Sequence, residues 1–410
     1  MTVSDVVTPA HAGVHRSPPP IPGLLKQLLM SMFAYQKNQR FFAQIADGLE
    51  ELGTEELSRL GATEVKPSYR GIYFSADAAA LYRINYSARL ITRVMAPLLT
   101  FNCHSDKYLY KTARSLPWTE LLSLKTTFAI FANVANSNIH HSQYAARRVK
   151  DAIVDLFRES CGDRPNVEPM YPDVWINLYI HNNKATISLE TSGGSLHRRG
   201  YRQESVEAPM QETVAAAIIQ LSGWNGERPL YDPMCGSGTL LTEALMHVCQ
   251  IPSGYLRQHF GFERLPDFDA ALWNEVKREC NGQIRPLPPG LICGSDLSGA
   301  AVEVAQKNCQ MLPGGNQITI STRRFQDIDA IKDTVILCNP PYGLRMNTAK
   351  QAATLLEEFD AFLKARCQGS VAYVYLGNKT LLKQIALRPS WKKPLKNGGL
   401  QGYLAKYEIR

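Results

Sequence analysis

The sequence predicts an α/β protein whose second half forms a parallel sheet with helices on both faces, preceded by two smaller α+β units. Three observations predict this class. After Ala208, strand-like and helical stretches alternate along the chain, as is typical of a parallel sheet. Before Ala208, two segments each mix strands with helices of amphipathic spacing. The composition, 45% hydrophobic and 20% charged over 410 residues, is that of a globular protein with several domains.

Residues 1–32 predict a disordered leader, because they contain "HRSPPPIPG" and few side chains that could build a core. They lack the long apolar stretch of a secretory signal. Nowhere does an apolar run approach the ~18 residues that a membrane span requires. We therefore expect a soluble, cytoplasmic protein.

The first α+β unit begins at Phe33. Residues 33–62 predict a strand-like opening followed by a helix that ends at Gly61. The stretch "GIYFSAD" predicts a strand, and residues 78–101 predict a helix that leads into another strand. The second unit predicts a helix over residues 142–160 and strands over residues 174–181 and 184–192.

Five strands are expected in the second half, in "RPLYDPM", "GLICGSDL", "QITISTRRF", "DTVILCNPP" and "SVAYVYLG". Helical stretches separate them, which favours a parallel sheet with helices on both faces. The ending "KNGGLQGYLAKYEIR" differs. It predicts a turn at Gly398 and Gly399 and a last strand made as a hairpin.

A glycine-rich turn in "YDPMCGSGTLLTEAL" places Gly236 and Gly238 between a strand and a helix. Glycines there let a ligand approach the backbone and the helix N-terminus. The turn is not typical of ATP binding, because no lysine follows Gly238 as in GxxxxGK[ST]. A dinucleotide site would place a third glycine where Leu241 stands. A helix-capping turn without a ligand is the remaining structural alternative.

S-adenosylmethionine fits this pattern better, because it has no pyrophosphate and needs close backbone approach. Asp296, at the end of the second strand, can accept both ribose hydroxyls. Asp327, after the third strand, can accept from the adenine amino group. Asp232 and Glu243 lie where the sulfonium and amino-acid end would sit.

The stretch "LCNPPYG" ends the fourth parallel strand, at the edge of the sheet where such folds bind ligands. The Asn339 side-chain oxygen and the Pro340 carbonyl can accept the two hydrogens of an exocyclic amino group on a base. Pro340 and Pro341 hold the backbone rigid. The ring of Tyr342 gives the target base a surface on which to stack. These residues predict methyl transfer to a planar amine.

The nine cysteines are scattered and form no CxxC pair. This spacing favours buried, reduced thiols over disulfides or zinc ligation. We expect no metal, and the proposed reaction needs neither a metal nor a covalent enzyme nucleophile.

Several motifs together resemble the THUMP-containing RNA guanine-N2 methyltransferases, in particular the bacterial 23S rRNA enzymes of the RlmL type. The motifs are "DPMCGSGT", "GSDLS", "NPPYGLRM" and "SLHRRGYR…APMQETVAAAII". The resemblance covers residues 33–410. It implies S-adenosylmethionine as cofactor, RNA as substrate, and a class I (Rossmann-like) sheet of seven strands whose last strand is antiparallel. The site residues that it implies are Asp232, Pro233, Gly236, Gly238, Glu243, Asp296, Asp327, Asn339, Pro340, Pro341 and Tyr342.

The resemblance also implies domains. A ferredoxin-like domain is expected over residues 33–100, a THUMP domain over 101–195 and the methyltransferase domain over 196–410. Some proteins of the family carry a second methyltransferase domain after the first. This chain stops at Arg410, so a single activity is expected.

RNA binding is predicted for two basic stretches, and the net charge of +8 agrees with a nucleic-acid partner. The residues expected to contact phosphates are Arg147, Arg148, Lys150, His197, Arg198, Arg199 and Arg202. Solvated charges on a helix and a linker are the structural alternative.

The function predicted from these features is methylation of guanosine N2 in RNA, with 23S rRNA as the substrate. Three alternatives stay open: a tRNA guanine-N2 methyltransferase, an adenine-N6 enzyme, and an RNA-binding ribosome-assembly factor that lacks catalysis. The motif "NPPY" is shared with adenine-N6 and glutamine methyltransferases, so it indicates the acceptor chemistry and leaves the substrate open.

Overall fold

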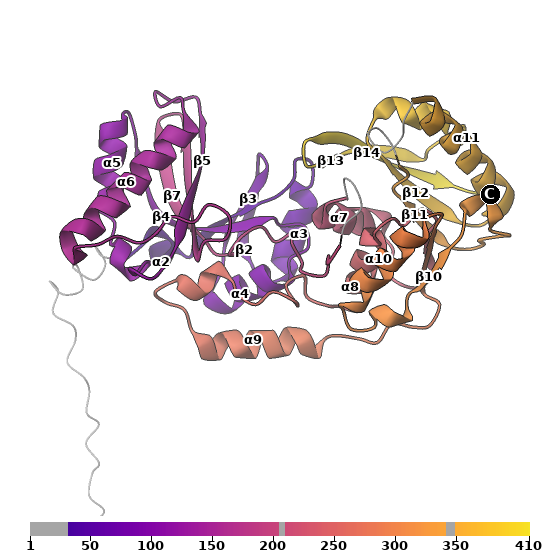
Figure 1. The fold of residues 1–410 in the computed structure, drawn as a ribbon, viewed down its shortest axis with the longest axis horizontal. Helices are drawn as coiled ribbons and strands as arrows, with labels where there is room; N and C mark the ends of the chain where they lie inside the picture. Colours follow the sequence, from indigo (N-terminus) through magenta and orange to yellow (C-terminus); the bar gives the residue numbers. More distant parts are fainter. Residues whose placement is uncertain (1–31, 205–209, 342–348) are drawn as a thin grey trace, which may run out of the picture.

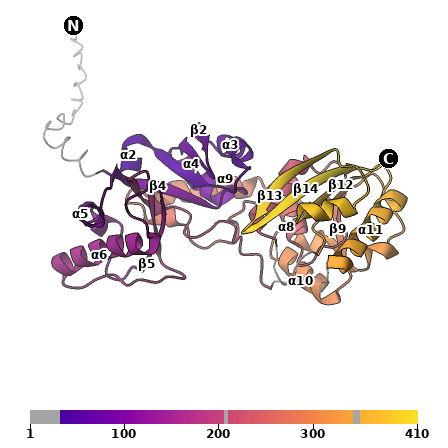
Figure 2. The same ribbon diagram turned by 90° about the horizontal axis from the view of Figure 1, so that it is seen from above.

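The computed structural model describes residues 32–204, 210–341 and 349–410, with side chains except at residue 349. The described chain forms two lobes, each built on a seven-stranded sheet. Figures 1 and 2 show these lobes side by side along the long axis of the molecule. The leader predicted over residues 1–32 lies outside the described residues except for Met32.

The N-terminal sheet has the strand order β2-β3-β1-β4-β7-β6-β5. Its strands are β1 (Arg40–Gln44), β2 (Thr63–Ser68), β3 (Gly71–Ser75), β4 (Arg93–Asn102), β5 (Phe128–Ala135), β6 (Val174–His181) and β7 (Lys184–Glu190). The central strand β4 pairs with β1 on one side and with β7 on the other. The two predicted α+β units therefore share one sheet, and the expected boundary between residues 100 and 101 falls inside β4.

Helices cover one face of this sheet. They are α2 (Ala34–Asn38), α3 (Glu50–Arg59), α4 (Ala78–Ser87), α5 (Asp106–Arg114) and α6 (Ser142–Cys161), with a short 3-10 turn η1 (Trp118–Glu120). In β6 the residues Ile176 and Leu178 are fully buried, whereas Tyr179 is 45% exposed. This alternation with a period of two is that of a sheet with one packed face. The strand-like opening expected at Phe33 is wrong in detail, because the short helix α2 precedes β1.

The C-terminal sheet has the order β10-β9-β8-β11-β12-β14-β13. Its strands are β8 (Leu230–Asp232), β9 (Ile292–Asp296), β10 (Thr319–Thr322), β11 (Val335–Cys338), β12 (Val371–Leu376), β13 (Trp391–Asn397) and β14 (Leu400–Glu408). The first five are parallel, and β14 is antiparallel to both β12 and β13. Gly398, with φ at 59°, turns the β13–β14 hairpin. The five predicted strands, the hairpin and the antiparallel last strand are confirmed.

The helices of this lobe are α7 (Glu212–Ser222), α8 (Thr239–Val248), α10 (Gly299–Gln310) and α11 (Ala349–Arg366). Short 3-10 turns are η2 (Gly261–Arg264), η3 (Gly315–Gln317), η4 (Phe325–Asp327) and η6 (Lys379–Gln384). Ser298 caps α10, because its hydroxyl accepts a hydrogen bond from the Ala301 amide. Asn378 caps η6 in the same way.

An insertion between α8 and β9 crosses back to the N-terminal lobe. Its helix α9 (Ala270–Gly282) packs on α4, and Figure 1 shows it below α4 of the N-terminal lobe. Trp273 of α9 meets the rings of Tyr86 and Phe262 edge-on, with centroids 5.3 Å and 5.1 Å away. Such contacts join the lobes through a buried aromatic cluster.

Within the three described ranges, no helix is long and apolar enough to cross a membrane. The nine cysteines are all free thiols. A search of the same ranges finds no cluster of three or more potential metal ligands.

Candidate active site

The glycine-rich turn joins β8 to α8. Gly236 and Gly238 have φ values of 53° and 76°, which favour glycine over residues with a Cβ. A Cβ on Gly238 would lie 3.2 Å from the Ala305 Cα, so the turn also brings α8 against α10. The Gly236 amide donates a hydrogen bond of 2.9 Å to Asp296 Oδ2. The turn and the end of β9 are therefore held together.

A cavity of about 680 Å³ opens at the carboxyl ends of the parallel strands, a size typical of small-molecule sites. Strand β8 lies between β9 and β11, so the strand order reverses there, where α/β sheets bind ligands. The residues that line the cavity are Pro233, Met234, Gly236, Asp296, Leu297, Ser298, Ala301, Arg324, Phe325, Gln326, Asn339, Pro341, Lys350, Gln351, Thr354, Leu355 and Glu358.

Asp296 lies at the mouth of this cavity, at the end of β9. Its second oxygen, Oδ1, accepts a hydrogen bond from the Ser298 amide at 3.0 Å. A carboxylate has about four lone-pair sites, so each oxygen can still accept from a ligand hydroxyl. Leu297 beside it is 70% exposed. An apolar side chain exposed in a cavity offers a surface for a flat, partly apolar ligand group.

Asn339 comes directly after β11 and faces the cavity with Pro341. Its side-chain oxygen is buried and has no hydrogen-bond partner among the described residues. Buried amide oxygens are normally paired, so this one is available to a ligand donor. Pro340 is buried beside it. Tyr342, predicted to stack on the target base, lies outside the described residues.

Asp232 ends β8 and is 1% exposed. It does not line the cavity, although Pro233 next to it does. Its Oδ1 accepts a hydrogen bond from the Met234 amide, which shapes the turn. Burial raises the pKa of the Asp232 carboxyl to about 8, with a further contribution from Asp296. Its neutral form is therefore favoured below that pH.

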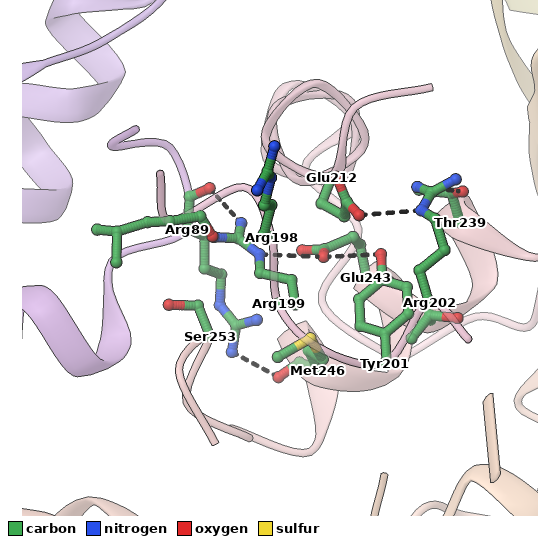
Figure 3. Close-up of polar contacts among 12 residues, drawn as sticks. Arg89, Arg198, Arg199, Tyr201, Arg202, Glu212, Thr239, Glu243, Met246 and Ser253 are labelled. Carbon is green, nitrogen blue, oxygen red and sulfur yellow. Dashed lines mark hydrogen bonds and ion pairs between the residues drawn. The ribbon is translucent and has the colours of Figure 1, made fainter. Parts of the chain in front are cut away.

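Glu243 is placed away from the cavity. It lies on α8 with 1% exposure, and its Oε1 accepts hydrogen bonds from Arg199 Nε at 3.3 Å and from the Tyr201 hydroxyl at 3.1 Å. Figure 3 shows these contacts between the linker and α8. The predicted cofactor contact of Glu243 is not supported, because its carboxylate neutralises a buried arginine instead.

Asp327 is exposed in η4 and does not line the cavity. Its neighbours Arg324 and Gln326 do, and Gln326 also donates a hydrogen bond to Glu358 at 2.6 Å. From the sequence, Asp327 was expected to accept a hydrogen bond from the adenine amino group. In the structure, Gln326 of the short 3-10 turn η4 lines the cavity, whereas Asp327 is exposed outside it. A ligand group on this side would meet an amide in place of a carboxylate.

The cavity contains residues that sequence reasoning missed. Leu297 follows the strand-end acid directly, and an apolar residue at the exposed end of a strand was the available signal. Lys350 and Glu358 come from α11. They gave no signal in the sequence, because their place depends on how α11 packs over the end of the sheet.

The seven predicted RNA contacts divide by burial. Arg147 and Arg198 are exposed. Arg148 lies over the Tyr110 ring at 4.7 Å, and Lys150 pairs with Asp151 at 2.6 Å. These four stay candidates for phosphate contacts.

The other three are paired or uncharged at pH 7. Arg199 is 1% exposed and paired with Glu243. Arg202 pairs with Glu212 at 3.1 Å and also bonds to Thr239, as Figure 3 shows. Burial and nearby arginines lower the pKa of His197 to about 4, so its ring is neutral at pH 7. The burial of Arg199 contradicts its predicted phosphate contact, whereas the contacts of the partly exposed His197 and Arg202 stay predictions.

Comparison with known families matches three parts of the chain. The model described as the RMKL-like methyltransferase domain matches residues 199–406. A THUMP domain model matches residues 103–190, and an RlmL ferredoxin-like domain model matches residues 40–95.

Individual proteins are also similar. The protein slr0064 of Synechocystis sp., which is named as an RNA methyltransferase without an established activity, is 39% identical to this chain. The match covers 90% of this chain and 96% of the Synechocystis protein. The Vibrio campbellii ribosomal RNA large subunit methyltransferase K/L is 36% identical over 90% of this chain. That match spans 53% of the Vibrio protein, so the chain spans about half the length of these K/L relatives.

A solved structure of the same shape is SMU.472, described as a methyltransferase complexed with S-adenosylhomocysteine. The superposition covers 91% of this chain and 98% of the SMU.472 chain, with a TM-score of 0.79 and 27% sequence identity.

Proposed function

Because the chain belongs to the RMKL-like methyltransferase family, we propose that its substrate is 23S rRNA and that it methylates the exocyclic N2 amino group of a guanosine there. The chain is an S-adenosylmethionine-dependent RNA methyltransferase, as family and neighbours agree. The proposal adds the base, the RNA and the role of each residue. The observation that carries it is the unpartnered Asn339 oxygen in the cavity.

The residues of the cavity fit S-adenosylmethionine. Asp296 is placed to accept from ribose hydroxyls, and the turn at Gly236 lets a ligand approach the backbone. The exposed Leu297 offers an apolar surface for the adenine. When bound, the cofactor supplies an electrophilic methyl group.

Asn339 orients the acceptor. Its Oδ1 and the Pro340 carbonyl would each accept one hydrogen of the base amino group, which favours a pyramidal nitrogen whose lone pair is no longer delocalised into the ring. Two acceptors fixed before the substrate arrives lower the cost of this geometry in the transition state. The rigid Pro340–Pro341 backbone keeps the acceptors in place. After methyl transfer the cationic amine gives one proton to solvent water, and no covalent enzyme intermediate is needed.

RNA binding is assigned to the N-terminal lobe and the linker. Arg147 and Arg198 are exposed cations there, and Arg148 and Lys150 lie on the same helix as Arg147. Phosphate contacts of this kind add to affinity and make it depend on salt. The 23S assignment comes from the ribosomal RNA named for the Vibrio relative. An rRNA substrate would place the protein in the cytoplasm.

The test is methylation of separate 23S rRNA and tRNA transcripts, followed by mass spectrometry of the nucleosides. We expect N2-methylguanosine in 23S rRNA. N6-methyladenosine would overturn the base assignment, and product confined to tRNA would overturn the RNA assignment.

Asn339→Ala tests the acceptor role. We expect methyl transfer to fall by about 10²–10³-fold, because an oriented polar contact to the reacting group is lost. The affinities for RNA and S-adenosylhomocysteine should stay near those of the wild type. Asn378→Ala is the matched control, since Asn378 follows β12 at the same edge and caps η6 outside the cavity. Full activity of Asn339→Ala would refute the role.

A further inference from the structure

Asn308 of α10 is buried, with 1% exposure, and bonds to two separate segments of the chain. Its Nδ2 donates to the Ser237 carbonyl at 3.0 Å, in the glycine-rich turn of residues 235–238, which we call the cofactor turn. Its Oδ1 accepts from the Gln203 amide at 3.0 Å, and its Nδ2 also donates to the Glu204 carbonyl at 3.3 Å. These two residues belong to the linker that joins β7 to α7. One amide side chain therefore bridges the linker and the cofactor turn.

The bond from Asn308 fixes one peptide group of the cofactor turn. The Ser237 carbonyl and the Gly238 amide belong to the same planar peptide group. The carbonyl accepts from Asn308, and the amide donates to the Cys235 carbonyl at 2.9 Å. Because this peptide group is held from both sides, the turn keeps one orientation before a ligand arrives.

The orientation of the cofactor turn matters for the cavity, because the turn presents Gly236 to it. The Gly236 amide donates to Asp296 Oδ2 at 2.9 Å, and Asp296 is the carboxylate placed to accept from the ribose hydroxyls. A rotation of the peptide between Ser237 and Gly238 would move Gly236 and disturb this bond. Asn308 itself does not line the cavity. It therefore acts on a bound cofactor through the turn.

A second bridge joins the same two segments. Arg202 of the linker donates from Nη2 to the hydroxyl of Thr239, the first residue of α8, at 3.2 Å. Arg202 is also paired with Glu212 at the start of α7, and Figure 3 shows these side chains together. The linker is thus attached on both sides of Gly238, at Ser237 and at Thr239. A shift of the linker and a change in the cofactor turn are therefore coupled.

We propose that Asn308 is a positioning residue for the cofactor: it holds the cofactor turn in the conformation that binds S-adenosylmethionine and couples that conformation to the linker. A binding turn that is ordered in advance raises affinity, because less ordering has to occur when the ligand binds. Coupling of this kind is reciprocal, so a bound cofactor should in turn stabilise the linker. The inference concerns the cofactor and is independent of which base or RNA is methylated.

The first test measures the affinity of the full chain for S-adenosylhomocysteine by isothermal titration calorimetry. We expect Asn308→Ala to weaken binding by about 10-fold, because the turn is no longer ordered in advance. In methylation of total cellular RNA, the KM for S-adenosylmethionine should rise by a similar factor, while kcat at saturating cofactor stays within about 2-fold of the wild type. A merely structural role would lower the amount of active protein and hence kcat, and would leave KM and the dissociation constant unchanged.

Gln306→Ala is the matched control. Gln306 also lies on α10, and its side-chain amide also donates to a backbone carbonyl, that of Ile320 at 3.2 Å. Ile320 belongs to β10, the outer strand of the sheet, so this bond does not reach the cofactor turn. Gln306→Ala should bind S-adenosylhomocysteine as the wild type does.

Thr239→Val tests the second bridge and keeps the inference testable if Asn308→Ala does not fold. Valine preserves the shape of the threonine side chain and removes the hydroxyl that accepts from Arg202. We expect binding of S-adenosylhomocysteine to weaken by about 3-fold, as for one hydrogen bond.

The second test measures the coupling itself, by hydrogen exchange and mass spectrometry with and without saturating S-adenosylhomocysteine. In the wild type we expect the ligand to slow exchange in the linker peptide that contains Gln203, since the Gln203 amide bonds to Asn308. Asn308→Ala should lose this protection even when it is saturated with ligand.

The positioning role would be overturned if Asn308→Ala, or Thr239→Val in its place, bound S-adenosylhomocysteine as tightly as Gln306→Ala. Linker protection that is missing in the wild type, or that persists in Asn308→Ala, would overturn the coupling. Either result would leave the proposed function standing. Failure of the proposed function shows separately, as a missing or different methylated nucleoside.

Discussion

At the scale of single residues, Asp232 shows how a position in the sheet changes acid–base behaviour. It ends a central strand, is 1% exposed and accepts a hydrogen bond from the Met234 amide. Burial raises its pKa from 3.8 to about 8. The folded chain therefore keeps the Asp232 proton up to about pH 8, whereas the unfolded chain releases it near pH 4.

This difference predicts how stability depends on pH. Between about pH 4 and pH 8 the folded state binds more protons at this site, so its contribution to the free energy of unfolding falls as pH rises. The slope is up to about 1.4 kcal/mol per pH unit. Asp232→Asn keeps the side-chain shape and the acceptor for Met234, and should flatten this slope.

Urea unfolding of both proteins at pH 5, 6, 7 and 8 measures the effect. Asp296→Asn serves as a comparison on the neighbouring strand, because Asp296 is partly exposed. Equal slopes for the wild type and Asp232→Asn would contradict the assignment.

At the scale of elements, the linker before α7 is fastened to α8 by charge. Arg199 bonds to Glu243 and also donates to the Leu196 carbonyl at 2.7 Å. Arg89, from the N-terminal lobe, donates to the carbonyls of Met246 and Ile251 at 2.6 Å and 2.7 Å. Burial raises the pKa of Glu243, and the two arginines oppose that rise. The junction of the lobes therefore depends on a buried ion pair.

Arg199→Leu should lower the free energy of unfolding by about 3–5 kcal/mol, because Glu243 is left buried without its partner. Arg198→Leu is the matched control, because Arg198 is the next residue in the chain and its side chain is exposed. The free energy of unfolding should change by no more than about 0.5 kcal/mol in this variant. The double variant Arg199→Leu/Glu243→Leu should recover part of the loss, since no charge remains unpaired.

Chemical denaturation of the wild type, Arg199→Leu, Glu243→Leu and the double variant gives the coupling energy of the pair, with Arg198→Leu measured beside them. If Arg199→Leu proved as stable as Arg198→Leu, the ion pair would contribute nothing to folding. RNA affinity should change in the opposite order: because Arg198 is exposed and proposed to contact phosphate, Arg198→Leu should weaken RNA binding without lowering stability.

At the scale of the molecule, the insertion with α9 determines how the lobes are joined. Tyr82 of α4 stacks on Phe262 at 4.6 Å, and Trp273 is 8% exposed between the two lobes. The Tyr86 hydroxyl donates to Asn281 at 2.8 Å. A rigid junction of this kind keeps the N-terminal lobe at a constant distance from the cavity.

Trp273→Ala should destabilise the junction by about 3–5 kcal/mol, as for a large core aromatic. Amides of α4 and α9 should then exchange faster together, as one cooperative unit. Hydrogen exchange followed by mass spectrometry measures this. Methylation of intact rRNA should fall, while affinity for S-adenosylhomocysteine should hold, because the cavity shares no residue with the cluster.

Trp391→Ala is the control for this experiment, since Trp391 lies on β13 and its ring contacts Tyr373 within the C-terminal lobe, away from the cluster around Trp273. It should leave exchange in α4 and α9 unchanged. Faster exchange in α9 with α4 unaffected would mean that the two helices are not coupled.

The sequence by itself determined much of the C-terminal lobe. Five apolar strands, the hairpin at Gly398 and the glycine turn could be predicted, because each leaves a local signal of periodicity or turn residues. The family resemblance is confirmed as well. Strands β2 and β5 were not predicted. Both are edge strands whose residues are mostly exposed or partly exposed, so their alternation is weak.

The tertiary structure alone decided what the charged and aromatic residues do. From the sequence, Arg199 was predicted to contact RNA and Glu243 to contact the cofactor. In the structure the two side chains form an ion pair with each other. Tyr86 and Trp273 are far apart in sequence, and their rings meet where α9 packs on α4. Periodicity is a property of neighbouring residues, whereas burial and ion pairing depend on which distant segments come together. For that reason the sequence indicated the chemistry, and the fold selected the residues available for it.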